Sequence, residues 1–246
     1  MNQTPETLLP YDKPDSKHEQ VADMFDAIAP EYDFMNRLMS FRQDIRWRRL
    51  SLKHLQALKP ALILDVATGT GDFALDTFHY LQPERVIGID LSAAMMEVGK
   101  QKAASAGLSE RLHFEQADCL DLPYENNRFD AIVSAFGIRN FENILLGLQE
   151  MHRVLKPGGR LVLLELSRPT WFPANVLFNA YTKLFMPLAG KLFTKDGQAY
   201  RYLPASIQLV PQGKEMERLM REAGFAQTSH HTYSLGACTL YLGDKA

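Results

Sequence analysis

Cysteine is scarce in this chain of 246 residues, which contains only Cys119 and Cys238. They lie far apart in sequence and lack the spacing of metal ligands, so they predict neither a zinc site nor a disulfide framework. No apolar run is long enough to cross a bilayer. The start of the chain, 1–18, is polar and rich in proline, which does not fit a secretory signal. We therefore expect a reduced, cytoplasmic protein with no metal and a disordered start over 1–18.

An excess of positive charge is also absent. The chain has 27 Lys and Arg against 29 Asp and Glu, a formal net charge of -2. Nucleic-acid-binding proteins usually carry a strongly basic face, so we expect no nucleic-acid partner. Arg42 to Lys53 is a local basic exception, and its spacing is typical of the solvated face of a helix.

The stretch 62–90 organises the chain. An apolar run, Leu62 to Val66, leads to the glycines Gly69 and Gly71, and a second apolar run ends at Asp90. This order predicts a buried strand, a tight turn, a helix and a second buried strand with an acid at its tip. The turn fits the G-x-G-x-x-A form, whose glycines let the backbone approach a ligand closely. Ordinary turns show such glycines too, but the surrounding strand, helix and acid indicate a nucleotide-like ligand.

Two acids flank this turn, Asp65 before it and Asp72 after it. Dinucleotide binders set a pyrophosphate at the start of the helix, where a carboxylate would repel it. S-adenosylmethionine has no phosphate and carries a sulfonium and an ammonium, so the acids favour it. We then expect Asp90 to accept hydrogen bonds from the ribose hydroxyls. The competing interpretation is that Asp65 and Asp72 cap a helix and that Asp90 is a solvated strand end.

Alternating strands and helices continue beyond Asp90 and predict an α/β fold with a mostly parallel sheet and ligands at the carboxyl ends of its strands. Further strands are expected at Leu112 to Glu115, Ala131 to Ala135 and Arg160 to Leu166, with a closing strand pair near the C-terminus. We expect one domain, composed of an N-terminal helical cap (19–59), a cofactor-binding core (60–168), an insertion (169–212) and a closing helix and strand pair (213–246).

The first half of the insertion, Trp171 to Phe193, is apolar and aromatic, and Lys183 and Lys191 are its only charged residues. Two interpretations are equally supported. The segment is either a core helix pair over the sheet, or a lid that grips a lipophilic substrate or rests on a bilayer. The aromatic and methionine side chains of 25–41 suit either a pocket wall or core packing.

Several motifs resemble the class I S-adenosylmethionine-dependent methyltransferases, and more narrowly the menaquinone and ubiquinone C-methyltransferase family (UbiE/MenG type). The resemblance runs from about Val21 to the C-terminus. The motifs that carry it are Phe25-Asp26-x-Ile28-Ala29-x-x-Tyr32-Asp33-x-Met35-Asn36, Phe136-Gly137-Ile138-Arg139-Asn140, Arg153-Val154-Leu155-Lys156-Pro157-Gly158-Gly159, Tyr200-Arg201-Tyr202-Leu203 with Ser206-Ile207, and Ala223-Gly224-Phe225.

The resemblance implies a Rossmann-like, seven-stranded, mostly parallel sheet whose last strand is antiparallel, with N-terminal helices and a helical insertion after strand five. It also implies cofactor contacts at Thr70, at Asp90 with the ribose, and at Asp118 and Cys119 near the adenine. Many family members have alanine where this chain has Cys119. Together with Gly69, Gly71 and Asp65, these residues form the expected site for S-adenosylmethionine.

The implied reaction is methyl transfer to a ring carbon of prenylated 2-demethylmenaquinol, with peripheral contact to the membrane surface and a homodimer as further expectations. A phenolate raises the electron density on its ortho carbon, so a base or a water held near the hydroxyl would favour the reaction. Arg139 is the candidate to hold a water or stabilise the phenolate, with Tyr202 and Tyr32 as weaker candidates.

The range of activities stays open in two respects. The ubiquinone precursor 2-methoxy-6-polyprenyl-1,4-benzoquinol is a second possible acceptor for an enzyme of this family. Outside the family, the competing hypotheses are a nucleic-acid N-methyltransferase, an NAD(P)-dependent oxidoreductase and a non-catalytic S-adenosylmethionine-binding module. The acidic balance of the chain disfavours the first, and the acids beside the glycine turn disfavour the second.

Overall fold

The apolar runs pair into a single seven-stranded sheet of order β3-β2-β1-β4-β5-β7-β6 in the computed structural model, which describes residues 4–186, 188, 190 and 197–246. The strands β3, β2, β1, β4 and β5 are parallel, whereas β7 is antiparallel to both β5 and β6. The predicted α/β fold, with a mostly parallel sheet and its last strand antiparallel, is therefore confirmed. The strands are β1 (Leu62–Val66), β2 (Arg85–Asp90), β3 (Leu112–Gln116), β4 (Phe129–Ala135), β5 (Leu155–Leu166), β6 (Gln227–Tyr233) and β7 (Cys238–Asp244).

Alternate side chains of the central strands enter two separate cores, one on each face of the sheet. Leu64 and Val66 lie in the core under α6 and α10, whereas Ile63 lies in the core that α3, α4 and α5 cover. The sequence of these strands is nearly continuously apolar because both faces are buried. The bounds of these helices are α3 (Gln43–Leu52), α4 (Asp72–Tyr80), α5 (Ala93–Ser105), α6 (Ile144–Val154) and α10 (Lys214–Glu222), and the short helix η1 (Lys53–Leu55) follows α3.

The fifth strand begins at Leu155 rather than at Arg160, where the sequence predicted it. Lys156 to Gly159 does not end the preceding helix but interrupts the pairing of β5 with β4, since Phe129 pairs with Leu155 and Ala131 pairs with Arg160. The extra residues are accommodated in a bulge, a common device near the end of a sheet.

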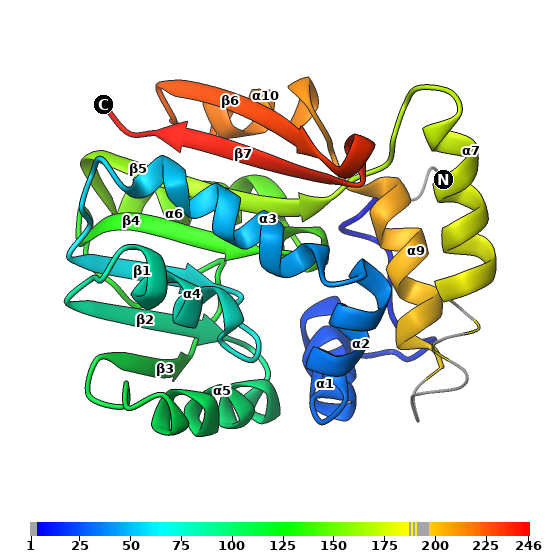
Figure 1. Cartoon of the computed structure of the whole chain (residues 1–246), viewed down its shortest axis with the longest axis horizontal. Coiled ribbons are helices and arrows are strands. Elements are labelled where there is room, and N and C mark those ends of the chain that lie inside the picture. The colour runs from blue at the N-terminus through cyan, green and yellow to red at the C-terminus, as the bar shows by residue number, and fades with distance from the viewer. Residues whose placement is uncertain (1–3, 187, 189, 191–196) are drawn as a thin grey trace.

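A third apolar cluster lies at the carboxyl ends of the parallel strands, where the N-terminal cap meets the insertion (Figure 1). Met24 and Met35 of the cap pack there with Met186, Tyr202 and Ile207 of the insertion. The cap and the insertion therefore cover the edge of the sheet at which α/β proteins bind ligands. The elements involved are α1 (Lys17–Ile28), α2 (Tyr32–Ser40), α7 (Ala174–Ala180), the π-helical turn η3 (Tyr181–Phe185) and α9 (Ala199–Leu209).

The beginning of the chain differs from the expectation of disorder over 1–18. Residues 4–16 are described, and α1 begins at Lys17 with Ser16 as its N-cap. The buried Lys17 ammonium donates to the carbonyl of Pro5 at 2.6 Å, and Leu8 joins the third apolar cluster. These contacts hold the polar start on the folded domain.

Within the described ranges, no helix combines the length and the apolarity needed to cross a membrane. The end of the expected segment Trp171 to Phe193, at 187, 189 and 191–193, lies outside the described residues.

Candidate functional site

The glycine turn after β1 brings three backbone positions with left-handed φ together, at Ala67 (54°), Gly69 (55°) and Gly71 (75°). A Cβ on Gly71 would lie 2.7 Å from Cζ of Phe114, so the turn packs too closely for a side chain there. Glycine removes this clash and permits the left-handed backbone. The turn thus places the Gly69 amide next to the end of β2.

Asp90 at the end of β2 is held by backbone amides. Its Oδ2 accepts a hydrogen bond from the Gly69 amide at 2.8 Å, and its Oδ1 accepts one from the Ser92 amide at 2.9 Å. Burial raises the pKa of the Asp90 carboxyl, while these amide hydrogen bonds act in the opposite direction. The carboxylate is therefore fixed at the tip of β2, with lone pairs left for a further donor.

Four of the expected cofactor residues line one cavity of about 70 Å³, and these are Gly69, Asp90, Asp118 and Cys119. The Asp118 carboxylate accepts from the Leu120 amide at 2.8 Å and faces His18 Nδ1 of α1 at 3.3 Å. Burial raises the pKa of the Cys119 thiol well above its usual value, so this side chain is a neutral, uncharged part of the wall. We call this space the cofactor cavity.

The other three expected residues lie outside the lining of the cofactor cavity. The Thr70 hydroxyl donates to Asp33 Oδ1 at 2.6 Å, on the side of the turn where α2 packs. The Asp65 Oδ2 accepts from the Thr68 hydroxyl at 2.7 Å and from the Ala74 amide at 3.0 Å, while its buried Oδ1 has no partner. Gly71 contributes the shape of the turn.

Burial raises the pKa of Asp65 to about 7, despite the hydrogen bonds from Thr68 and Ala74. An unpartnered carboxylate oxygen close to the turn is the kind of group that a cationic ligand stabilises in its charged form.

The charge of Asp72 is already balanced by cations of the cap and of α5, which corrects one step of the sequence argument. Arg37 lies 3.1 Å and Arg48 3.2 Å from Asp72 Oδ2, and Lys102 contacts Oδ1. Burial alone would raise the pKa of the Asp72 carboxyl, but the neighbouring cations hold it below its usual value. Asp72 therefore anchors the cap to the glycine turn, and Asp65 is the acid of the pair that keeps an unpaired oxygen.

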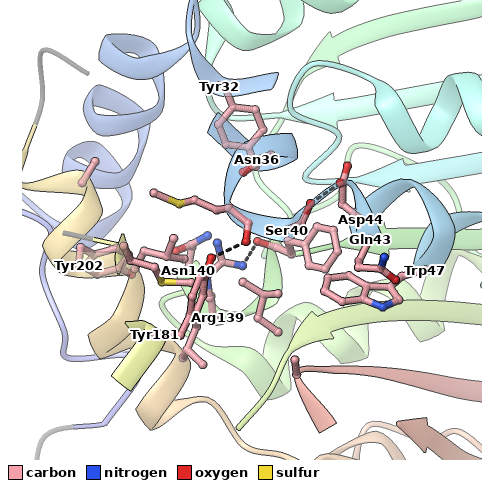
Figure 2. A pocket seen from close by; sticks show the side chains of 18 of the residues that line it. Tyr32, Asn36, Ser40, Gln43, Asp44, Trp47, Arg139, Asn140, Tyr181 and Tyr202 are labelled. Atoms are coloured by element: carbon pink, nitrogen blue, oxygen red, sulfur yellow. Dashed lines mark hydrogen bonds between the residues drawn. The ribbon is translucent and has the colours of Figure 1, made fainter. Parts of the chain in front are cut away.

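A second, larger cavity of about 280 Å³ lies between the cap, the insertion and the carboxyl ends of the strands. Figure 2 shows Arg139 and Asn140 among the residues that line this cavity, together with Tyr202 and Trp47. We call it the acceptor cavity. Its wall is mainly apolar and aromatic. The two cavities share four lining residues, Phe25, Tyr32, Phe136 and Asn140.

Arg139 is buried in the wall of the acceptor cavity and does not extend to solvent. Its Nη1 pairs with Glu165 Oε1 at 2.8 Å and also donates to the carbonyl of Phe136, while its Nε has no partner. Glu165, on β5, is equally buried and also accepts from the Arg139 amide at 3.2 Å. The ion pair holds the guanidinium in a single orientation at the rim of the sheet.

Two neighbouring side chains also keep buried polar atoms without a partner, the Asn140 Oδ1 and the Tyr202 hydroxyl. Buried polar groups are normally hydrogen-bonded, so such unpaired atoms around one cavity indicate a polar ligand. Burial raises the pKa of Tyr202 to about 12, and it also raises that of Tyr32. Both tyrosines stay protonated at neutral pH and can donate hydrogen bonds, but neither is a general base.

Comparisons with known proteins identify the family of the chain. The ubiE/COQ5 methyltransferase family matches residues 13–245. The chain belongs to this family. A demethylmenaquinone methyltransferase of Bacteroides fragilis is 48% identical over 245 residues, covering all of both chains. A ubiquinone/menaquinone biosynthesis C-methyltransferase of Geotalea daltonii is 44% identical, covering 93% of this chain and 97% of its own.

Solved structures share the fold with this methyltransferase at low sequence identity. The [4+2]-cyclase SpnF aligns with a TM-score of 0.62 at 17% identity, covering 93% of this chain and 96% of its own. A possible histamine N-methyltransferase of Thermotoga maritima aligns with a TM-score of 0.62 at 20% identity, covering 91% and 99%. Because one fold serves such different reactions, the reaction must be argued from the site and the family.

Sequence reasoning missed Glu165 and Asn140. Glu165 is the only charged residue between Leu161 and Leu166, and an acid in a buried strand signals a buried partner. Asn140 directly follows Arg139, but only the fold shows that it borders both cavities. Within the described residues, no group of three or more His, Cys, Asp or Glu side chains could hold a metal ion.

Replacing Asp90 with alanine should weaken S-adenosylmethionine binding by roughly 2 to 4 kcal/mol, because hydrogen bonds to a charged acceptor are lost. Isothermal calorimetry measures the affinity directly. Glu97, an acid on α5 that does not line the cofactor cavity, supplies the control variant Glu97→Ala, which should bind normally. An affinity of Asp90→Ala within a factor of two of the wild type would remove Asp90 from the site.

The raised pKa of Asp65 predicts that S-adenosylmethionine binding at pH 7 releases protons. With a pKa of about 7, about half of the free protein carries a neutral Asp65, and a bound cation lowers that pKa. Release should vanish above about pH 9, where Asp65 is already ionised. Calorimetry in buffers of different ionisation enthalpy counts the protons. Asp65→Asn should abolish the release, and an unchanged proton count in that variant would place the cation away from Asp65.

Proposed function

We propose that this methyltransferase transfers the methyl group of S-adenosylmethionine to a ring carbon of 2-demethylmenaquinol, giving menaquinol and S-adenosylhomocysteine. The observation that carries the proposal is the common wall of the two cavities. Phe25, Tyr32, Phe136 and Asn140 border both the expected cofactor position and the apolar acceptor cavity, so the two spaces adjoin. A ring in the second cavity would therefore lie next to a sulfonium in the first. The names of the relatives that are 48% identical support this acceptor.

The reaction needs orientation more than covalent help from the protein. The quinol hydroxyl loses its proton, the ortho carbon attacks the methyl carbon in line, and the bond between that carbon and sulfur breaks. The ring carbon then loses its own proton and the ring becomes aromatic again, while the sulfonium has become a neutral thioether. An enclosed, apolar cavity excludes water and holds the two reactants in one geometry, which supplies much of the rate.

Arg139 suits the role of stabilising the phenolate that forms before the attack. A fixed guanidinium in a water-poor cavity interacts strongly with a developing negative charge, and it needs no reorganisation during the reaction. The Glu165 carboxylate balances its charge before substrate binds. In this proposal Tyr202 and Asn140, whose polar atoms lack partners, hydrogen-bond the quinol oxygens.

We extend the proposal to contact with a membrane surface, because demethylmenaquinol is a lipid. Leu177 (66%) on α7 and Leu184 (72%) on η3 are exposed, as is Phe172 (79%) just before α7. Exposed apolar side chains on a helix that also borders the acceptor cavity favour a peripheral location on the inner face of the cytoplasmic membrane. The inner side of the same segment packs Phe178 and Tyr181 against the cavity.

Reduced quinol, and not oxidised quinone, should be the methyl acceptor. Only the quinol has a hydroxyl whose deprotonation raises the electron density on the ring carbon. The test is transfer of radiolabelled methyl from S-adenosylmethionine to demethylmenaquinone under anaerobic conditions, with and without a reductant. A parallel reaction with 2-methoxy-6-polyprenyl-1,4-benzoquinol tests the ubiquinone precursor. Equal rates with and without reductant would contradict the phenolate mechanism.

Removing the charge of Arg139 should lower turnover far more than cofactor affinity. Arg139→Leu alone would leave Glu165 buried and unpaired, which costs about 3 to 5 kcal/mol of folding free energy. The informative variant is therefore Arg139→Leu with Glu165→Gln, which removes both charges. Its kcat should fall by about 100-fold, equivalent to about 2.7 kcal/mol, with the S-adenosylmethionine affinity within a factor of two. A loss of cofactor binding with an unchanged chemical step would contradict the role given to Arg139.

A further inference from the structure

Two exposed residues mark where the described lining of the acceptor cavity reaches the surface. Among the described residues that line it, only Phe41 and Ser234 have exposed side chains, and the others are buried or half-buried. Phe41 is 65% exposed at the junction of α2 and α3, and Ser234 begins the short turn η4 (Ser234–Gly236) between β6 and β7. The mouth of the cavity therefore lies between these two junctions, which are far apart in sequence.

The rim of this mouth is apolar although it faces solvent. Leu235 is 67% exposed and directly follows Ser234, and Trp171 is 48% exposed and donates its indole N–H to the Leu235 carbonyl at 3.2 Å. Phe172, 79% exposed, comes next in the chain. Large apolar side chains gathered around the opening of a cavity are typical of a site that receives an apolar ligand.

The backbone on both sides of the mouth adopts strained conformations that hold these side chains in place. Phe41 and Arg42 have φ of 51° and 62°, and Ser234 and Leu235 have φ of 46° and 61°. A left-handed backbone costs a residue other than glycine roughly 1 to 2 kcal/mol, so four such residues at one opening require a reason. Strained residues of this kind cluster at ligand sites.

Aromatic rings continue from the mouth into the cavity wall. The Phe41 ring stacks on Phe185 with centroids 5.8 Å apart and lies 6.1 Å from the ring of Tyr181. Tyr181 in turn stacks on Phe185 at 5.2 Å. These rings belong to α2, η3 and their junctions, so they form an apolar path that leads from the cavity to the surface.

The size of the cavity requires that a long substrate extend beyond it. A volume of about 280 Å³ is just below the range of pockets that hold drug-sized ligands, about 300 to 1,000 Å³. A quinol ring fits such a space, but a chain of several prenyl units does not. With the ring at the wall shared with the cofactor cavity, the remainder must leave through an opening.

We propose that the polyprenyl chain of the acceptor leaves the acceptor cavity between Phe41 and Ser234 and lies across Leu235 and Trp171. Phe41 and Leu235 then determine the preference for acceptors with a tail. This inference rests on the proposed function, because it assumes that the ring is methylated in the acceptor cavity. Each methylene removed from water contributes about 0.8 kcal/mol, so even one prenyl unit on the rim adds measurably to binding.

A competing exit lies beside Tyr202. An open groove shares the Tyr202 side chain with the acceptor cavity, and its lining mixes apolar residues such as Leu8 and Leu9 with the charged Asp12 and Arg201. Tyr202 is only 6% exposed and separates the two spaces, and the charged residues of the groove suit an apolar chain less well. The observations therefore favour the mouth at Phe41.

Kinetics with two acceptors test the proposed path. Leu235→Glu and Phe41→Ala should lower kcat/KM for a prenylated demethylmenaquinol at least tenfold, while kcat/KM for tail-less 1,4-naphthohydroquinone stays within twofold. Matched controls are Phe34→Ala and Leu58→Glu, since both residues are exposed and neither lines the cavity. The control variants should keep both activities. Equal losses for both acceptors, or no loss for either, would overturn the proposal. A selective loss in Arg201→Glu instead would assign the tail to the groove beside Tyr202.

Binding of a prenyl alcohol gives a second measurement that does not depend on methyl transfer. In a Trp47→Phe background, which leaves Trp171 as the only tryptophan, farnesol should shift the emission to shorter wavelength with and without Phe34→Ala, and should do so much more weakly with Leu235→Glu. An equal shift in Leu235→Glu would overturn the assignment of the rim. If the wild type binds farnesol in this way but methylates neither quinol, the proposed function fails while the apolar path stands as a binding site.

Discussion

The attachment of the N-terminal cap to the glycine turn is the constraint on which both cavities depend. Arg37 and Arg48 from the cap and Lys102 from α5 converge on the Asp72 carboxylate at the start of α4. Partly buried networks of this kind fix geometry even where their net contribution to stability is modest. They hold α2 so that Tyr32 faces both the turn and the acceptor cavity. Without this attachment the common wall of the cavities would not exist.

The common wall places the two cavities side by side, as methyl transfer requires. Methyl transfer requires the donor and the acceptor to meet in line and water to stay away. Here the cofactor side is built from backbone amides and carboxylates at the ends of β1, β2 and β3, whereas the acceptor side is built from the aromatic cap and insertion. The ends of the parallel strands thus form a polar environment on the cofactor side, and a separate apolar cluster forms an apolar environment on the acceptor side. The buried pair of Arg139 and Glu165 brings one fixed positive group into the apolar side.

The segment formed by α7 and η3 has one side on the acceptor cavity and one side on the surface. Phe178 and Tyr181 face the acceptor cavity, while Leu177 and Leu184 are exposed on the outer side. An ordinary surface helix places polar residues on its outer side. The outer side of α7 and η3 exposes Val176, Leu177 and Leu184 beside the polar Asn179 and Lys183. This largely apolar outer side supports the proposed contact of the segment with a lipid phase.

Sequence alone determined the sheet, the glycine turn and the position of Asp90, because strand periodicity, turn chemistry and strand ends are local properties. That Gly69, Asp118 and Cys119 line one cavity with Asp90 was also predictable, since they follow strands of one parallel sheet. Only the tertiary structure decided the partners of the charged residues and the shape of the acceptor side. Arg48 pairs with Asp72 and Arg139 with Glu165, and Phe41 and Ser234 line the same cavity although they are far apart in sequence. No periodic pattern in the sequence specifies these placements, because they depend on how the cap and the insertion pack over the sheet.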